Sequence, residues 1–140
     1  MPLASRRLGY LIAVLVNLGL AYLVNVWPGW QEVPWLTAET RDVLGLVNLS
    51  LLAGAVVNLA YIAYDHPWFK ALGELVTTGI SLAVVVQLYS VFPFDFSAYA
   101  FDWSLVARMV LVVAILGTGI GTLASLVRFV VRAGAALLPR

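Results

Sequence analysis

Four long stretches of the chain contain no charged residue, and they limit the possible folds more than any other feature. The uncharged stretches are Leu8–Trp27, Val43–Tyr64, Leu75–Phe94 and Met109–Val127. Each has roughly the 20 residues that an α-helix needs to cross about 30 Å of hydrocarbon, at about 1.5 Å of rise per residue. Because these stretches and their short connections take up the chain, we predict an all-α integral membrane protein with four transmembrane helices.

The composition agrees with a membrane location. Of the 140 residues, 63% are hydrophobic and 11% are charged, whereas about a quarter of the residues in a soluble domain are charged. The chain has no cysteine, which excludes disulfides, zinc–thiolate sites and thiol catalysis. A net charge of +1 gives no reason to expect a nucleic acid as partner. The partner that the composition does predict is the lipid bilayer.

The breaks between the uncharged stretches predict where the helices end. Pro28 and Gly29 end the first helix, and Asp65 is expected to cap the third, with Pro67 in its first turn. Short connections make consecutive helices antiparallel neighbours. We therefore predict a single domain over residues 1–140, an up-down-up-down four-helix bundle. The approximate helices are 8–27, 38–64, 67–92 and 104–132.

The basic residues predict the orientation of this bundle. When the N-terminus is placed in the cytosol, six basic residues lie on the cytosolic side and two lie outside, as the positive-inside rule requires. The cytosolic set is Arg6, Arg7, Lys70, Arg128, Arg132 and Arg140, and the outer set is Arg41 and Arg108. We therefore expect both termini in the cytosol. Seven arginines against one lysine indicate a GC-rich bacterial genome, and hence a bacterial cytoplasmic membrane.

Four asparagines lie inside the first two uncharged stretches, each within a V-N-[LV] tripeptide. They are Asn17, Asn25, Asn48 and Asn58. If the two helices are antiparallel, Asn25 lies near the depth of Asn48, and Asn17 lies near that of Asn58. One interpretation is a pair of interhelical hydrogen-bonded contacts, each worth about 0.6 kcal/mol. The alternative is that the carboxamides line a polar path for a solute.

The fourth uncharged stretch contains the most specific packing motif. Gly117 and Gly121 form a G-x-x-x-G pair that continues to Ser125. Helices in lipid associate through close backbone approach at small residues, since burying leucine against leucine gains little there. We expect this row to face either another helix of the chain or another subunit.

Three charged residues lie near the predicted membrane boundaries. Glu74 and Arg128 have similar depths, so we expect an ion pair; the alternative is that Glu74 couples protons or cations through a raised pKa. Arg108 stands in the second turn of the fourth helix, near the positive end of its dipole. A carboxylate is therefore expected to compensate Arg108, from Asp42, Asp95 or Asp102; the alternative is that Arg108 attracts anions.

No enzyme motif is present in the sequence. The chain has one histidine, His66, and no cysteine, which cannot make the usual zinc sites. We therefore expect no metal, no cofactor and no enzymatic activity. The predicted function is that of a small membrane protein that forms a homo-oligomer, or an accessory or assembly subunit of a larger membrane complex. The alternative is an oligomeric channel or carrier with an Asn- and Thr-lined path and Glu74 as its coupling site.

Overall fold

The computed structural model describes residues 2–138, and this part of the chain consists of four long α-helices and one short 3-10 helix. The elements are α1 (Leu3–Asn25), η1 (Trp30–Glu32), α2 (Thr40–Ala63), α3 (Pro67–Val91) and α4 (Trp103–Leu137). All four α-helices are long and apolar enough to cross a membrane. This confirms the prediction of an all-helical chain with four candidate spans, and it agrees with integration in a membrane.

Two helices extend further than the sequence predicted, α1 at its start and α4 at its end. α1 begins at Leu3 and includes Arg6 and Arg7, whereas its predicted start was residue 8. α4 has 35 residues and continues to Leu137, so it is about 52 Å long and exceeds the roughly 30 Å of a hydrocarbon core. The absence of charge limits a membrane span but not a helix, because arginine and alanine are both good helix formers.

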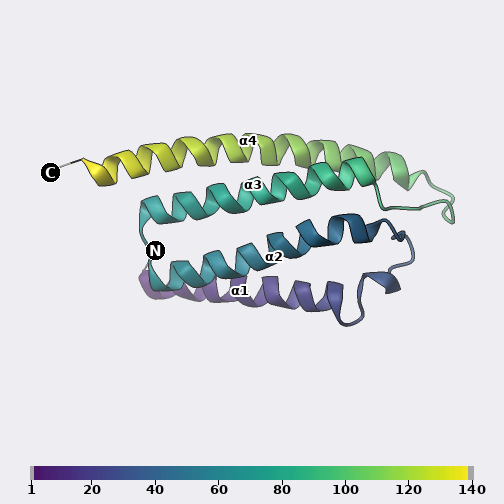
Figure 1. Cartoon of the computed structure of the whole chain (residues 1–140), viewed down its shortest axis with the longest axis horizontal. Coiled ribbons are helices and arrows are strands. Elements are labelled where there is room, and N and C mark those ends of the chain that lie inside the picture. The colour runs from purple at the N-terminus through teal and green to yellow at the C-terminus, as the bar shows by residue number, and fades with distance from the viewer. Residues whose placement is uncertain (1, 139–140) are drawn as a thin grey trace.

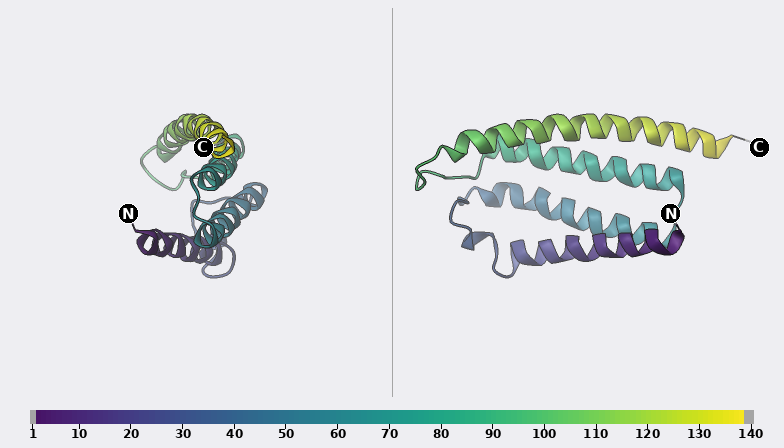
Figure 2. Two further views of the ribbon diagram at one scale, coloured as in Figure 1. Left: turned by 90° about the vertical axis from the view of Figure 1, so that its left-hand side faces the viewer. Right: turned by 180° about the vertical axis from the view of Figure 1, so that it is seen from behind.

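The helices form a curved row in which each one packs on the next along the chain. Consecutive helices run in alternating directions (Figure 1). Extensive contacts join α1 to α2, α2 to α3 and α3 to α4, while α1 and α4 are not among the packed pairs of the described residues. The view along the helices places α1 and α4 at opposite ends of the row (Figure 2, left). A lateral face of α4 is therefore left without a neighbouring helix.

The two ends of the row differ in character. At one end α1 begins, α2 turns into α3 and α4 terminates (Figure 1); we call this the arginine end. At the opposite end, the loop end, two longer connections meet. Their backbones are joined by hydrogen bonds from Thr37 N to Pro93 O at 2.9 Å and from Asp95 N to Trp35 O at 2.9 Å.

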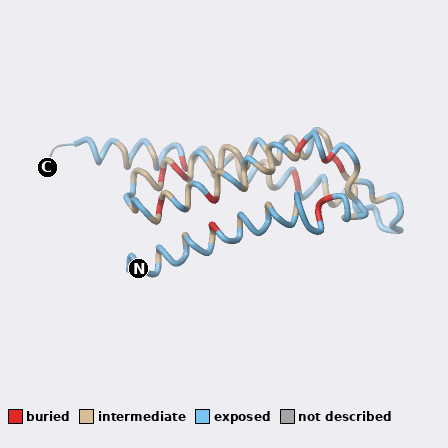
Figure 3. Tube along the Cα trace, turned by 60° about the horizontal axis from the view of Figure 1, so that its bottom comes forward, coloured by how far each residue is buried: buried red, intermediate tan, exposed pale blue. Residues whose placement is uncertain are grey.

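Few side chains are buried in the described part of the chain, and most of those few belong to the four α-helices. Buried positions are scattered along the trace, and exposed or intermediate positions dominate every helix (Figure 3). Within the four candidate spans, only 6% to 11% of the residues are buried. The outward faces carry leucine, valine and isoleucine side chains. Such surfaces suit helices solvated by lipid, whose acyl chains are as apolar as leucine.

Candidate functional site

The asparagine pair nearest the loop end joins α1 to α2. Asn25 Nδ2 donates to Asn48 Oδ1 at 2.6 Å, and Asn48 Nδ2 donates to Asn25 Oδ1 at 2.9 Å. Asn25 Nδ2 also lies 2.8 Å from the carbonyl oxygen of Ala21. The contact predicted between these two side chains is present. Because both hydrogen bonds need the carboxamides at one depth, the pair sets the register of the two helices.

The second predicted asparagine contact was wrong, since Asn17 packs on a glycine instead of bonding to Asn58. A Cβ atom added to Gly54 would lie 2.6 Å from Asn17 Oδ1 and 2.9 Å from Asn17 Cγ. Asn17 Nδ2 donates to Ala13 O at 2.8 Å, and Asn58 Nδ2 donates to Gly54 O at 2.7 Å.

The register explains this outcome. Asn48 and Asn58 are two residues further apart than Asn17 and Asn25, which amounts to about 3 Å of helical rise. With Asn25 set against Asn48, Asn17 falls between Gly54 and Asn58. The missing side chain of Gly54 leaves room for the Asn17 carboxamide, and the Asn58 side chain donates to its own helix.

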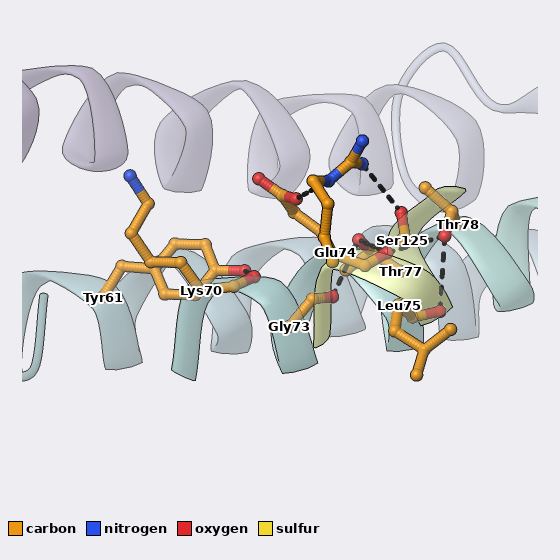
Figure 4. Close-up of polar contacts among 9 residues, drawn as sticks. Tyr61, Lys70, Gly73, Glu74, Leu75, Thr77, Thr78 and Ser125 are labelled. Carbon is orange, nitrogen blue, oxygen red and sulfur yellow. Dashed lines mark hydrogen bonds and ion pairs between the residues drawn. The ribbon is translucent and has the colours of Figure 1, made fainter. Parts of the chain in front are cut away.

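A third close contact joins α2 to α3 and involves a tyrosine that no sequence motif predicts to be important. The Tyr61 hydroxyl occupies the place of the missing Gly73 side chain and donates to Lys70 O at 3.0 Å (Figure 4). Tyr61 is buried, at 6% exposure. Gly73, Thr77 and Ser81 form a row of small residues at four-residue intervals, and this row is the signal in the sequence that could have indicated a contact at Gly73. The partner, by contrast, depends on how α2 is rotated about its axis.

The two glycines of the α4 motif have no such neighbour. A Cβ atom added to Gly117 or Gly121 would meet nothing within 4 Å. At about 100° per residue, Val110, Gly117, Gly121 and Arg128 fall within about 40° of one another around α4. We call this the glycine side of α4. It flanks the face that packs on α3, where Ser125 is completely buried.

The ion pair between α3 and α4 is present and partly open. Arg128 Nε lies 3.5 Å from Glu74 Oε2, with side chains that are 44% and 42% exposed (Figure 4). Arg128 Nη2 also donates to Ser125 Oγ at 3.1 Å. Lys70 Nζ lies 5.2 Å from the centroid of the Tyr10 ring. Arg128, and not Lys70, therefore pairs with Glu74.

The carboxylate expected beside Arg108 is absent, and aromatic rings take its place. The guanidinium carbon lies 4.0 Å from the centroid of Phe92 and 5.6 Å from that of Tyr89. Between residues 2 and 138, the two ion pairs are those of Arg6 with Asp65 and Arg128 with Glu74. The electron-rich faces of the rings attract the cation, so Arg108 binds the end of α3 without an acid.

The sequence predicted that Asp65 caps α3, and this prediction was wrong. Asp65 instead joins the start of α1 to the α2–α3 turn. Its Oδ2 accepts hydrogen bonds from Arg6 Nε at 2.7 Å and from the Tyr10 hydroxyl at 3.0 Å. The Arg6 hydrogen bond lowers the pKa of Asp65 below its ordinary value. The N-cap position is held by His66, without a side-chain hydrogen bond, and Pro67 opens the helix as predicted.

Two cavities lie at opposite ends of the row. The basic cavity, of about 470 Å³, lies at the arginine end, and its lining comprises Arg6, Asp65, Pro67, Lys70, Glu74 and Arg132. The aromatic cavity, of about 610 Å³, lies at the loop end between Trp35, Phe94, Phe96, Tyr99 and the first two turns of α4. In the part of the chain that the structure covers, no group of His, Asp and Glu side chains is arranged to hold a metal ion.

Comparisons with known protein families, curated proteins and solved structures find no match. The function is therefore inferred from the arrangement of the side chains alone.

Proposed function

We propose that this chain is a non-enzymatic membrane subunit that self-associates through the glycine side of α4. The single observation behind the proposal is the open space above Gly117 and Gly121. We further propose that both termini lie in the cytosol, in a bacterial cytoplasmic membrane, because that orientation places Arg6, Arg7 and Arg128 on the cytosolic side.

Within the chain, two glycines serve as contact points between neighbouring helices. Gly54 receives the Asn17 carboxamide and Gly73 receives the Tyr61 hydroxyl. Gly117 and Gly121 lie near the middle of α4, where two crossing helices come closest. A G-x-x-x-G pair allows two such helices to cross at about −40° with their backbones in contact. These two glycines therefore fit a helix supplied from outside the chain.

A second copy is the partner that this surface suits best. In a two-fold symmetric dimer the same patch meets itself, so each glycine pair faces the other. The glycine side carries no charged residue between Val110 and Arg128, so no charge lies at the point where the two helices would cross. Association with a different membrane protein would make the chain an accessory subunit, which is one outcome of the experiment below.

The polar side chains inside the spans favour packing over a solute path. Asn25 and Asn48 bond to each other, and Asn17 and Asn58 donate to carbonyls of their own helices. The span threonines also donate to the preceding turn of their own helices; they are Thr77, Thr78, Thr118 and Thr122. Side-chain donors that are used in this way are not available to bind a passing solute.

The proposal is tested by energy transfer between labelled copies in lipid bilayers. Gly121→Ile should lower the fraction of associated copies at least tenfold, because the added side chain prevents close approach of the second helix. A Cβ atom at this position would meet nothing within 4 Å in the described chain, so the circular dichroism should be unchanged. Gly119→Ile is the matched control. This glycine also has open space around it, but it lies about 160° around the helix from both Gly117 and Gly121.

Two results would overturn self-association. One is equal energy transfer for wild type, Gly121→Ile and Gly119→Ile. The other is a gently extracted complex with one copy of this chain and a fixed, different partner.

A further inference from the structure

The basic cavity brings together charged side chains from three helices and one turn. Arg6 comes from α1, Lys70 and Glu74 from α3, and Arg132 from α4. Asp65 lines it from the α2–α3 turn, and Arg128 reaches its edge through the ion pair with Glu74. The cluster holds four cations and two carboxylates, so positive charge is in excess.

The two carboxylates are already neutralised by arginines. Asp65 accepts from Arg6 Nε at 2.7 Å, and its side chain is only 9% exposed. Glu74 Oε2 lies 3.5 Å from Arg128 Nε. The excess charge therefore resides on the two remaining cations, Lys70 and Arg132.

The side-chain hydrogen-bond donors of these two cations are not used within the described residues. The Lys70 ammonium lies over the Tyr10 ring at 5.2 Å, and Figure 4 shows Lys70 and Glu74 extending to the same side of α3. Within residues 2–138, the Arg132 guanidinium makes no hydrogen bond or ion pair. It lines both the basic cavity and a second cavity of about 540 Å³ beside Tyr64, His66 and Trp68. A group with several acceptor oxygens would satisfy both cations at once.

The surroundings of Arg132 indicate the depth of this site. Trp68 and Tyr64 line the second cavity, which shares Arg132 with the basic cavity. Such side chains favour the headgroup layer of a bilayer, where one edge of the ring stays hydrated. Basic pockets between transmembrane helices at this depth suit the headgroups of anionic lipids. A phosphate diester carries one negative charge and two free oxygens, which matches an ammonium and a guanidinium facing one cavity.

We propose that the basic cavity binds the headgroup phosphate of an anionic phospholipid, with Lys70 and Arg132 as its ligands. Arg6 and Arg128 compensate the negative charges of Asp65 and Glu74. The site does not require self-association, because two helices that cross at Gly117 and Gly121 diverge toward their ends. A protein that fails one of the two tests can therefore pass the other.

The test measures lipid retention by native mass spectrometry, on the full chain in a neutral detergent. The wild type should bind phosphatidylglycerol more tightly than phosphatidylcholine with the same acyl chains. Arg132→Gln should weaken the binding of phosphatidylglycerol about fivefold, as should Lys70→Gln. Arg132→Lys should retain most of it. Arg7→Gln is the matched control, because it removes the same charge from an exposed position at the same end, outside the cavity.

Three outcomes would overturn the proposal. The first is no preference for phosphatidylglycerol over phosphatidylcholine. The second is an equal loss in Arg7→Gln and Arg132→Gln, which would indicate general surface charge. The third is displacement of the lipid by inorganic phosphate at matching concentration, which would make the site one for free phosphate. Unchanged circular dichroism of Arg132→Gln and Lys70→Gln shows that a loss of binding is not a loss of fold.

Discussion

Gly54 of α2 and Gly73 of α3 differ from Gly117 and Gly121 of α4 in one respect: a side chain of a neighbouring helix packs against the first two, and none packs against the second two. At Gly54 and Gly73 an added Cβ atom would overlap a side chain of the next helix. At Gly117 and Gly121 the same atom would meet nothing. Glycine thus has two roles that the sequence does not distinguish. A glycine whose missing side chain is replaced by a side chain of the next helix holds the chain together, and a glycine with free space beside it leaves room for another molecule.

The largest effect is expected where a glycine is most completely filled. Gly73→Ala would place a methyl group against the Tyr61 hydroxyl, 2.7 Å from Tyr61 Cζ and 2.8 Å from Val57 Cγ1. Because Tyr61 is buried, the free energy of unfolding should fall by about 2 to 3 kcal/mol. Thermal unfolding in detergent micelles measures this change. Gly79→Ala, on the same helix with open space around it, should unfold no earlier than wild type.

Gly54→Ala should have a somewhat smaller effect, about 1 to 2 kcal/mol of lost unfolding free energy. It would crowd the Asn17 carboxamide, with Oδ1 at 2.6 Å and Cγ at 2.9 Å. Shortening the opposing side chain should recover much of the loss, so Gly54→Ala is expected to cost less in an Asn17→Ala background. Strictly additive effects of the two substitutions would contradict the contact. Gly45→Ala, in open space on the same helix, is the control.

The reciprocal hydrogen bonds between Asn25 and Asn48 should give a smaller, measurable coupling. A double-mutant cycle with Asn25→Ala and Asn48→Ala is expected to yield about 0.6 kcal/mol, and not more than about 1.7 kcal/mol. The value is modest because asparagines in unpacked membrane helices also find partners. A cycle between Asn17→Ala and Asn58→Ala provides the comparison, since these two side chains bond to their own helices. Its coupling should be near zero.

The two ion pairs differ in exposure: the Asp65 side chain is 9% exposed, whereas the Glu74 side chain is 42% exposed. The Arg6 hydrogen bond lowers the pKa of Asp65, so the stability this group contributes is present above its ordinary pKa of about 3.9. That contribution is lost as the pH falls through the lowered value in the folded protein. Asp65→Asn should therefore flatten the dependence of the unfolding temperature on pH below about 4.

Glu74→Gln should change stability least, by about 0 to 1 kcal/mol, because exposed ion pairs contribute little. The pair with Arg128 leaves both side chains more than two-fifths exposed. Flux of protons or cations through liposomes that contain wild type, but not Glu74→Gln, would contradict a packing role and favour a carrier.

The four spans could be predicted from the sequence, whereas the contacts between the helices could be predicted only in part. The four helices followed from uncharged length, and the Asn25–Asn48 contact followed from matching depths along two antiparallel helices. Depth alone failed at Asn17, because the register differs by two residues and Gly54 was nearer in space. The contact of Tyr61 with Gly73 and the contact of Arg108 with Phe92 depend on how each helix is rotated about its axis. That rotation is decided by all the contacts together, which no single motif encodes.

Cysteine scanning of α4 tests the central claim most directly, that its glycine side faces a second copy of the chain. The chain has no cysteine, so each introduced thiol is the only one present. Single cysteines at Val110, Gly117 and Gly121 should form intermolecular disulfides when the membranes are oxidised. Cysteines at Val112, Gly119 and Leu126, on the opposite side of α4, should form few. Cross-linking that is equal at all six positions, or greater in the second set, would contradict the account.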